Sequence, residues 1–93
     1  MLEQAIEDRF VRRAEDRGAL APKFEPPGSN GWPDRIVFLP DGRVLLVEFK
    51  APGERPRRLQ RTRHRQLRER DHVVHVCDSH EKADALIEQY LPA

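Results

Sequence analysis

Two short apolar runs joined by a turn constrain this chain's fold more than any other feature. The runs, IVFL at residues 36–39 and VLLV at residues 44–47, are separated by a turn of Pro40, Asp41 and Gly42 and by Arg43. Apolar runs on either side of such a turn predict a β-hairpin. The second run has no polar residue, which is typical of a strand covered on both faces. We therefore expect a hairpin over residues 34–39 and 43–50, with its second strand in the centre of a sheet.

Three charged residues lie at the open end of this hairpin. Glu48 and Lys50 end the second strand, and Asp34 begins the first. Because side chains alternate faces along a strand, Glu48 and Lys50 share one face and Phe49 points to the other. Antiparallel pairing returns Asp34 to the side of Glu48. Two carboxylates and a lysine at one place suit a divalent cation and an anionic substrate. By spacing alone, however, a simple Glu–Lys ion pair at a strand end is at least as good an explanation.

The length of 93 residues predicts one small domain over residues 1–93. The only cysteine, Cys77, excludes a disulfide within the chain and fits a reducing compartment. No apolar run approaches membrane-spanning length, and the N-terminus has no signal-peptide pattern. We therefore expect a cytoplasmic protein with no membrane partner.

Helical and strand patterns predict further elements around the hairpin. Leu2, Ile6, Phe10 and Ala14 recur every four residues and predict a helix over residues 2–17. Strands are expected at residues 21–25 and 72–77, a second helix at residues 57–70, and a third that ends before Pro92. The order of elements is α-β-β-β-α-β-α. Glu7 borders the apolar stripe of the first helix and could reach the sheet, although a solvated helix acid is the commoner case.

Positive charge is concentrated in the second predicted helix. The formal net charge of the chain is only +1, yet residues 55–70 hold eight arginines against the single acid Glu69. That segment has a net charge of +7 and leaves −6 for the rest. A basic element on an acidic domain indicates a polyanion partner, and arginine suits forked contacts to phosphate. A solvated basic face is the alternative. The expected DNA-binding residues are Arg55, Arg57, Arg58, Arg61, Arg63, Arg65 and Arg68.

The order of elements and these motifs resemble the PD-(D/E)xK nuclease superfamily. More narrowly, the chain resembles a stand-alone phage or bacterial member of the VRR-NUC (virus-type replication and repair nuclease) family. The resemblance implies an α/β, restriction-endonuclease-like fold with a mixed sheet flanked by helices. One departure is Asp71, which stands where the family usually has glycine but tolerates the same left-handed backbone. The residues that support the resemblance are Glu7, Lys23, Phe24, the motif Gly31-Trp32-Pro33-Asp34-Arg35, the motif Val47-Glu48-Phe49-Lys50, and Gln60.

The resemblance implies metal-dependent hydrolysis of DNA phosphodiester bonds. Asp34, Glu48 and the Phe49 carbonyl would hold Mg²⁺ or Mn²⁺. Lys50 would orient the attacking water or offset the charge of the phosphate. The remaining two residues lie on the flanking helices: Glu7 would support the metal site, and Gln60, which faces the sheet from the basic helix, would position Lys50 or the substrate.

Small stand-alone members of the family look like homodimers that cut branched DNA, such as four-way junctions or flaps, in a bacterial cell or a phage-infected host. Two identical active sites related by a two-fold axis suit symmetric nicking of a junction. Two alternatives stay open: a DNA-binding module without catalysis, and a nuclease that cuts DNA or RNA without selectivity. The chain has no line of aromatic residues for stacking bases, which argues against an RNA-binding protein.

Overall fold

The computed structural model describes residues 2–92 and contains three helices and a three-stranded sheet. Strands β1 and β2 are antiparallel, β2 and β3 are parallel, and the order in the sheet is β1-β2-β3. The predicted α/β fold with a mixed, helix-flanked sheet and a central second hairpin strand is therefore confirmed. In chain order the elements are α1 (Glu3–Asp16), β1 (Arg35–Phe38), β2 (Val44–Phe49), α2 (Arg58–Arg68), β3 (Val74–Cys77) and α3 (His80–Tyr90).

The predicted first strand, at residues 21–25, is only partly formed. Isolated bridges join Leu20 to Phe38 and Lys23 to Arg35, so the segment runs antiparallel beside β1 without becoming a continuous strand. Pro22 has no N–H group to donate, although its carbonyl accepts a hydrogen bond from the Ile36 N–H at 3.2 Å. The order α-β-β-β-α-β-α is thus kept in space, with its first strand reduced to two bridges.

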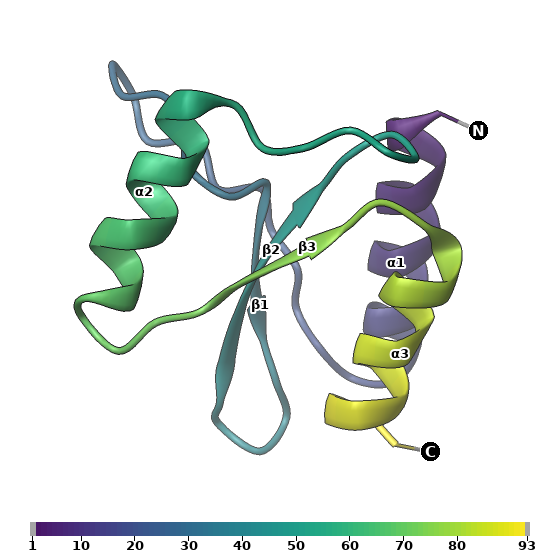
Figure 1. Cartoon of the computed structure of the whole chain (residues 1–93). Helices are drawn as coiled ribbons and strands as arrows, with labels where there is room; N and C mark the ends of the chain where they lie inside the picture. Colours follow the sequence, from purple (N-terminus) through teal and green to yellow (C-terminus); the bar gives the residue numbers. More distant parts are fainter. Residues whose placement is uncertain (1, 93) are drawn as a thin grey trace.

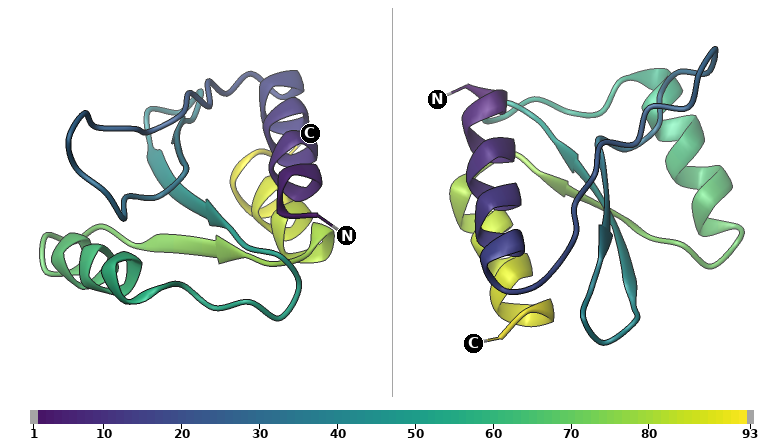
Figure 2. Two further views of the ribbon diagram at one scale, coloured as in Figure 1. Left: turned by 90° about the horizontal axis from the view of Figure 1, so that it is seen from above. Right: turned by 180° about the vertical axis from the view of Figure 1, so that it is seen from behind.

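The sheet lies between α2 and the pair formed by α1 and α3 (Figure 1). Helices α1 and α3 lie side by side on one face of the sheet, and α2 stands apart from them (Figure 2). The core between α1, α3 and the sheet includes Ile6, Phe10, Val47, Phe49 and Ile87, each at most 1% exposed. Within residues 2–92, no helix has both the length and the apolar composition needed to cross a membrane.

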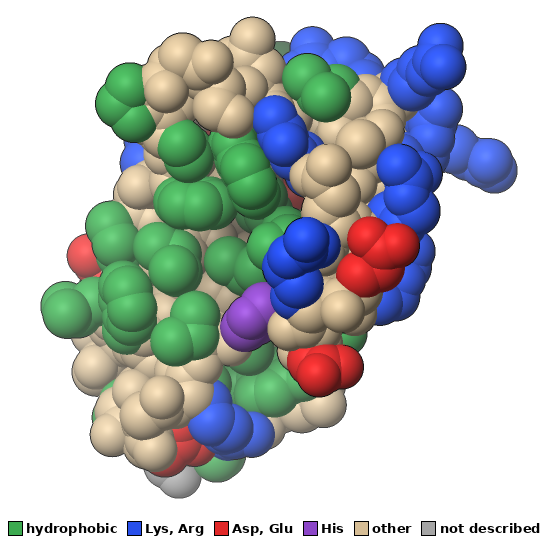
Figure 3. Space-filling model, turned by 90° about the vertical axis from the view of Figure 1, so that its left-hand side faces the viewer, with side chains coloured by type: hydrophobic (Ala, Val, Ile, Leu, Met, Phe, Trp, Pro, Cys, Tyr) green, Lys and Arg blue, Asp and Glu red, His purple; other side chains and the backbone are tan. Residues whose placement is uncertain are grey.

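The other face of the sheet is apolar and more open. The register that pairs Phe38 with Val44 and Ile36 with Leu46 places these four side chains on that face. Phe38 and Val44 are 43% and 49% exposed. Viewed from the side of α2, hydrophobic side chains form one area directly beside a cluster of lysine and arginine side chains (Figure 3). We call the face formed by Ile36, Phe38, Val44 and Leu46 the open sheet face.

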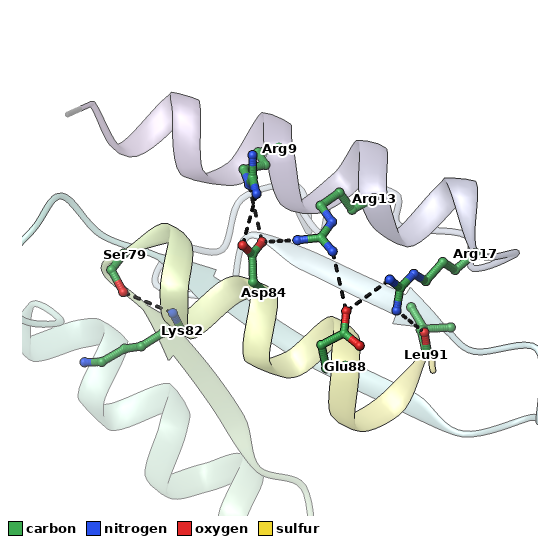
Figure 4. A network of polar contacts seen from close by, with 8 residues as sticks. All are labelled: Arg9, Arg13, Arg17, Ser79, Lys82, Asp84, Glu88 and Leu91. Carbon is green, nitrogen blue, oxygen red and sulfur yellow. Dashed lines mark hydrogen bonds and ion pairs between the residues drawn. The ribbon is translucent and has the colours of Figure 1, made fainter. Parts of the chain in front are cut away.

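Ion pairs join α1 to α3 (Figure 4). Arg9 and Arg13 of α1 and its C-cap residue Arg17 recur every four residues. They meet Asp84 and Glu88, also four residues apart, on α3. Asp84 pairs with Arg9 at 3.1 Å and with Arg13 at 2.6 Å, and Glu88 pairs with Arg17 at 3.0 Å. The network fixes the two helices that cover the core.

We expect Asp84→Ala to lower the free energy of unfolding at pH 7 by about 0.5–1 kcal/mol, since it removes the acid that pairs with Arg9 and leaves Arg13 with Glu88 alone, at 3.5 Å. The Arg9 and Arg13 guanidinium groups lower the pKa of Asp84 below its usual 3.8. A depressed carboxyl pKa stabilises the fold above the unfolded-state pKa and loses that effect as the pH falls through the folded-state value. Urea unfolding should therefore show that the free energy of unfolding changes less between pH 7 and pH 3 for Asp84→Ala than for Glu15→Ala. Glu15 is an exposed acid on α1 and serves as the control. Equal differences would contradict this role.

Candidate active site

Asp34 and Glu48 meet at the end of the hairpin, as the sequence predicts. Arg35 pairs with Val47, so Asp34, one residue earlier, lies opposite Glu48. The Phe49 N–H donates a hydrogen bond of 2.8 Å to Asp34 Oδ2, which holds the Asp34 carboxylate against the end of β2. Burial raises the pKa of Asp34, and the nearby charge of Glu7 adds to that shift. Asp34 is therefore a fixed carboxylate in a partly dehydrated place.

Glu48 is fully buried, and its two carboxylate oxygens have different surroundings. Oε1 lies 3.0 Å from His64 Nε2, whereas Oε2 has no hydrogen-bond partner within residues 2–92. Burial raises the pKa of Glu48, and His64 opposes the shift. The simple Glu–Lys ion pair considered for this strand end is wrong, since Glu48 pairs with a histidine of α2. An unpartnered buried carboxylate oxygen is costly unless something else binds it.

Lys50 is 6% exposed and lies on the same face as Glu48. Its backbone N–H donates to the Cys77 carbonyl at 3.0 Å, which fixes the end of β2 beside β3. No ion pair within residues 2–92 involves the Lys50 ammonium group. Its charge lowers the pKa of both Asp34 and Glu48, so it acts on this site without being neutralised by either carboxylate.

Glu7 faces the site from α1 and is 5% exposed, so the reading of a solvated helix acid is wrong. Its Oε2 accepts a hydrogen bond of 2.8 Å from Arg35 Nε, and Arg35 Nη1 donates to the Ala21 carbonyl at 2.8 Å. Glu3, one turn earlier on the same face, has a pKa raised by burial and by the charge of Asp34. Glu3 was not among the predicted site residues, although its spacing of four residues from Glu7 places it on the same face of the helix.

Gln60 is buried in α2, as its predicted position toward the sheet requires. Its Oε1 accepts a hydrogen bond of 2.7 Å from the Arg57 N–H, so it caps the start of α2. His64, one turn further, makes the contact to Glu48. Gln60 and His64 are four residues apart and so share one face of α2, although only Gln60 was predicted as a site residue. Its predicted action on Lys50 or on the substrate stays a prediction.

The predicted DNA-binding arginines fall into two groups. Arg58, Arg61, Arg65 and Arg68 share one face of α2 by their spacing of three and four residues. These four arginines are exposed, as are Arg55 and Arg57 before the helix. None of the six makes an ion pair within residues 2–92. Arg63 lies outside this group, is half-buried, and contacts the loop at residues 26–33. The first group provides a basic surface for a polyanion.

The donors at the site fit a hard divalent cation. Mg²⁺ is commonly held by one or two carboxylates together with water and substrate phosphates. The site offers the carboxylates of Asp34 and Glu48 and the main-chain carbonyl of Phe49. The unpartnered Oε2 of buried Glu48 supports this fit. Within residues 2–92, no three histidine, cysteine, aspartate or glutamate side chains form a metal-binding cluster, so water and phosphate oxygens would complete such a site.

Two known proteins are similar to this chain over most of its length. No family model matches the chain. It is 42% identical over 84 residues to the protein named "Putative nuclease p44" of Acyrthosiphon pisum secondary endosymbiont phage 1, covering 90% of both sequences. A solved structure described as "VRR_NUC domain" superposes with a TM-score of 0.87 at 34% identity, covering 95% of this chain and 96% of that one.

Proposed function

The chain belongs to the VRR-NUC family, and from that premise we propose that it is a DNA endonuclease that requires Mg²⁺ or Mn²⁺ and prefers branched DNA. The observation that most directly supports the chemistry is the free oxygen of buried Glu48, next to Asp34 and on the same strand face as Lys50. Such a set of groups suits hydrolysis of a phosphodiester bond better than a structural role, because a structural role would leave the Glu48 oxygen unsatisfied.

Each residue of the site has a separate task in this proposal. Asp34 and Glu48, with the Phe49 carbonyl, would hold the cation. A bound Mg²⁺ or Mn²⁺ supplies Lewis-acid polarisation of the scissile phosphate and lowers the pKa of water. His64 keeps the Glu48 carboxylate in one orientation through the contact of 3.0 Å. Lys50 offsets the growing negative charge on the phosphate oxygens or orients the attacking water. Glu7 acts through Arg35, which fixes the strand next to Asp34.

In this proposal, the DNA backbone is bound by the exposed arginines of α2 and of the segment directly before it. Contacts from guanidinium groups to phosphates fix the position of DNA without reading its sequence. Binding should therefore weaken steeply as the salt concentration rises. The relative from a phage fits action in the cytoplasm of a bacterial or phage-infected cell.

The test is a cleavage assay on a four-way junction, a flap and a linear duplex of the same length, each with Mg²⁺, Mn²⁺ or EDTA. We expect cutting only with a divalent cation, and faster cutting of the branched substrates. Full activity in EDTA would overturn metal dependence. Equal rates on all three substrates would leave a nuclease without branch selectivity, and salt-dependent binding without any cutting would identify a DNA-binding module.

We propose that a second copy of the chain covers the open sheet face. That face is apolar, and the charged backbone of DNA offers no apolar groups to cover it. An identical face of a second copy offers matching apolar side chains around a two-fold axis. Two active sites in one dimer suit paired cuts in a junction.

We expect Phe38→Glu to halve the molar mass measured by light scattering, because it places a charge on this face at a side chain that is already 43% exposed. Leu2→Glu is the matched control, since Leu2 is 75% exposed at the start of α1 and lies away from the open sheet face. A wild-type chain that is monomeric at high concentration, or a Phe38→Glu chain with unchanged mass, would contradict the dimer.

A further inference from the structure

Arg63 of α2 contacts the loop at residues 26–33 through two nitrogens of its guanidinium group and through the face of that group. Nε donates to the Asn30 carbonyl at 2.9 Å, and Nη2 donates to Ser29 Oγ at 3.1 Å. Nη1 donates to Gln66 Oε1 at 3.1 Å, which holds the group from its own helix. The Arg63 Cζ lies 4.4 Å from the centroid of the Trp32 ring. Three of the five guanidinium N–H groups are therefore engaged within the protein, and a group held in this way is less available to phosphate than an exposed one.

The loop that Arg63 contacts is ordered by further short-range contacts. Trp32 Nε1 donates to Ser29 Oγ at 2.8 Å, so the Ser29 hydroxyl accepts from both Trp32 and Arg63. The Trp32 ring also packs edge-on against Phe24, with centroids 5.7 Å apart. Gly31 has φ +85° and lies so close to α2 that a Cβ there would come within 2.6 Å of Leu59 Cγ. The loop and α2 therefore form one packed unit.

This unit leads directly to the active site. Trp32 is followed by Pro33, which is fully buried, and then by Asp34. The Asp34 carbonyl accepts a hydrogen bond of 2.9 Å from the Phe24 N–H, and its side chain accepts from the Phe49 N–H. The loop also lines a cleft of about 330 Å³ whose wall includes Asp34 and Glu7. The position of Asp34 depends on where this loop is held.

We propose that Arg63 is a positioning residue, which fixes the loop at residues 26–33 and through it Asp34, instead of binding DNA with the exposed arginines. The proposal rests on the proposed nuclease function for its kinetic consequences, whereas its structural consequence can be measured without any activity. The eight arginines of residues 55–70 look alike in the sequence, and Arg63 differs from the other seven by its contacts to the loop.

The structural test uses Trp32, which is the only tryptophan of the chain and lies under Arg63. We compare Arg63→Ala with Arg65→Ala, because Arg65 is exposed on the same helix. Arg63→Ala should increase quenching of Trp32 fluorescence by acrylamide and shift its emission, whereas Arg65→Ala should change neither. Arg63→Lys keeps the charge but lacks the planar fork, so it should resemble the alanine variant more than the native chain.

The kinetic test separates binding from turnover on a cleavable branched DNA with Mg²⁺. Arg63→Ala should lower kcat on the order of 10-fold, as for other residues that support a metal site indirectly. Arg65→Ala should mainly raise KM and the Kd for DNA. Because Ser29 accepts from Arg63, the kcat losses of Arg63→Ala and Ser29→Ala should be strongly non-additive, whereas those of Arg65→Ala and Ser29→Ala should add.

Thermal melts of all variants show whether each protein is folded under assay conditions. Arg63→Lys serves in place of Arg63→Ala if the alanine variant does not fold. Unchanged quenching of Trp32 in a folded Arg63→Ala or Arg63→Lys protein would overturn the proposal. The same changes in kcat, KM and Kd as in Arg65→Ala would also overturn it. If the wild-type chain cuts no DNA, the nuclease function fails, and the difference in quenching still decides whether Arg63 holds the loop.

Discussion

A chain with Glu48→Gln should cut DNA at least about 10²–10³-fold more slowly than the native chain, the range for removing one group that stabilises transition-state charge. The amide lacks the negative charge that the cation needs, yet it has the same size and still offers an oxygen to His64. The same variant should be as stable as the native chain, or more stable, in the absence of metal. Burial raises the pKa of Glu48, so its ionised form opposes folding above that pKa, and this cost disappears as the pH falls through it. The Glu48→Gln substitution removes the cost at pH 7.

Three measurements distinguish loss of the cation from loss of the fold. Mg²⁺ should raise the Tm of the native chain, since it binds only the folded state, and should leave the Tm of Glu48→Gln nearly unchanged. DNA affinity in EDTA should match that of the native chain, because the exposed arginines are intact. A Glu48→Gln protein that cuts DNA at the native rate would remove Glu48 from the mechanism. A Tm far below the native value would show that Glu48 has a structural role instead.

The central part of the site could be predicted because it depends on strand geometry alone. Alternation of faces places Glu48 and Lys50 together, and antiparallel pairing returns Asp34 to Glu48, whatever surrounds the hairpin. Both statements need only the turn at residues 40–42. The left-handed backbone of Asp71, with φ 65°, was expected from the resemblance, since aspartate tolerates the conformation of the glycine that the family usually has there.

The contacts between distant elements could not be predicted in the same way. Eight arginines in sixteen residues look equivalent, and only the packing of the loop on α2 makes Arg63 different. The partner of Glu48 is His64 because α2 approaches that side of the sheet, and no spacing in the sequence specifies this approach. The strand expected at residues 21–25 is only partly formed for a local reason, since Pro22 has no N–H group to donate to β1.

Replacing Lys50 by methionine should reduce cleavage by about 10²–10³-fold while leaving the binding of the cation intact. Methionine has the length of the apolar stem of lysine, so most of the buried position stays filled, and the ammonium group with its charge is lost. That charge lowers the pKa of both Asp34 and Glu48, so its removal leaves the two carboxylates with less positive charge nearby. A divalent cation should then bind as tightly as before, or more tightly.

The Lys50→Met chain should therefore differ from Glu48→Gln in one decisive measurement. Mg²⁺ should still raise its Tm, by at least as much as in the native chain, although both variants cut DNA poorly. Lys50→Arg restores the charge with a different shape and should recover part of the cleavage rate. If Lys50→Met loses the Mg²⁺ response as well, Lys50 acts by holding the carboxylates in place. If it keeps the native cleavage rate, the charge that offsets the phosphate must come from another residue. Lys23 is a candidate, because it lines the same cleft as Asp34 and its charge lowers the pKa of Asp34.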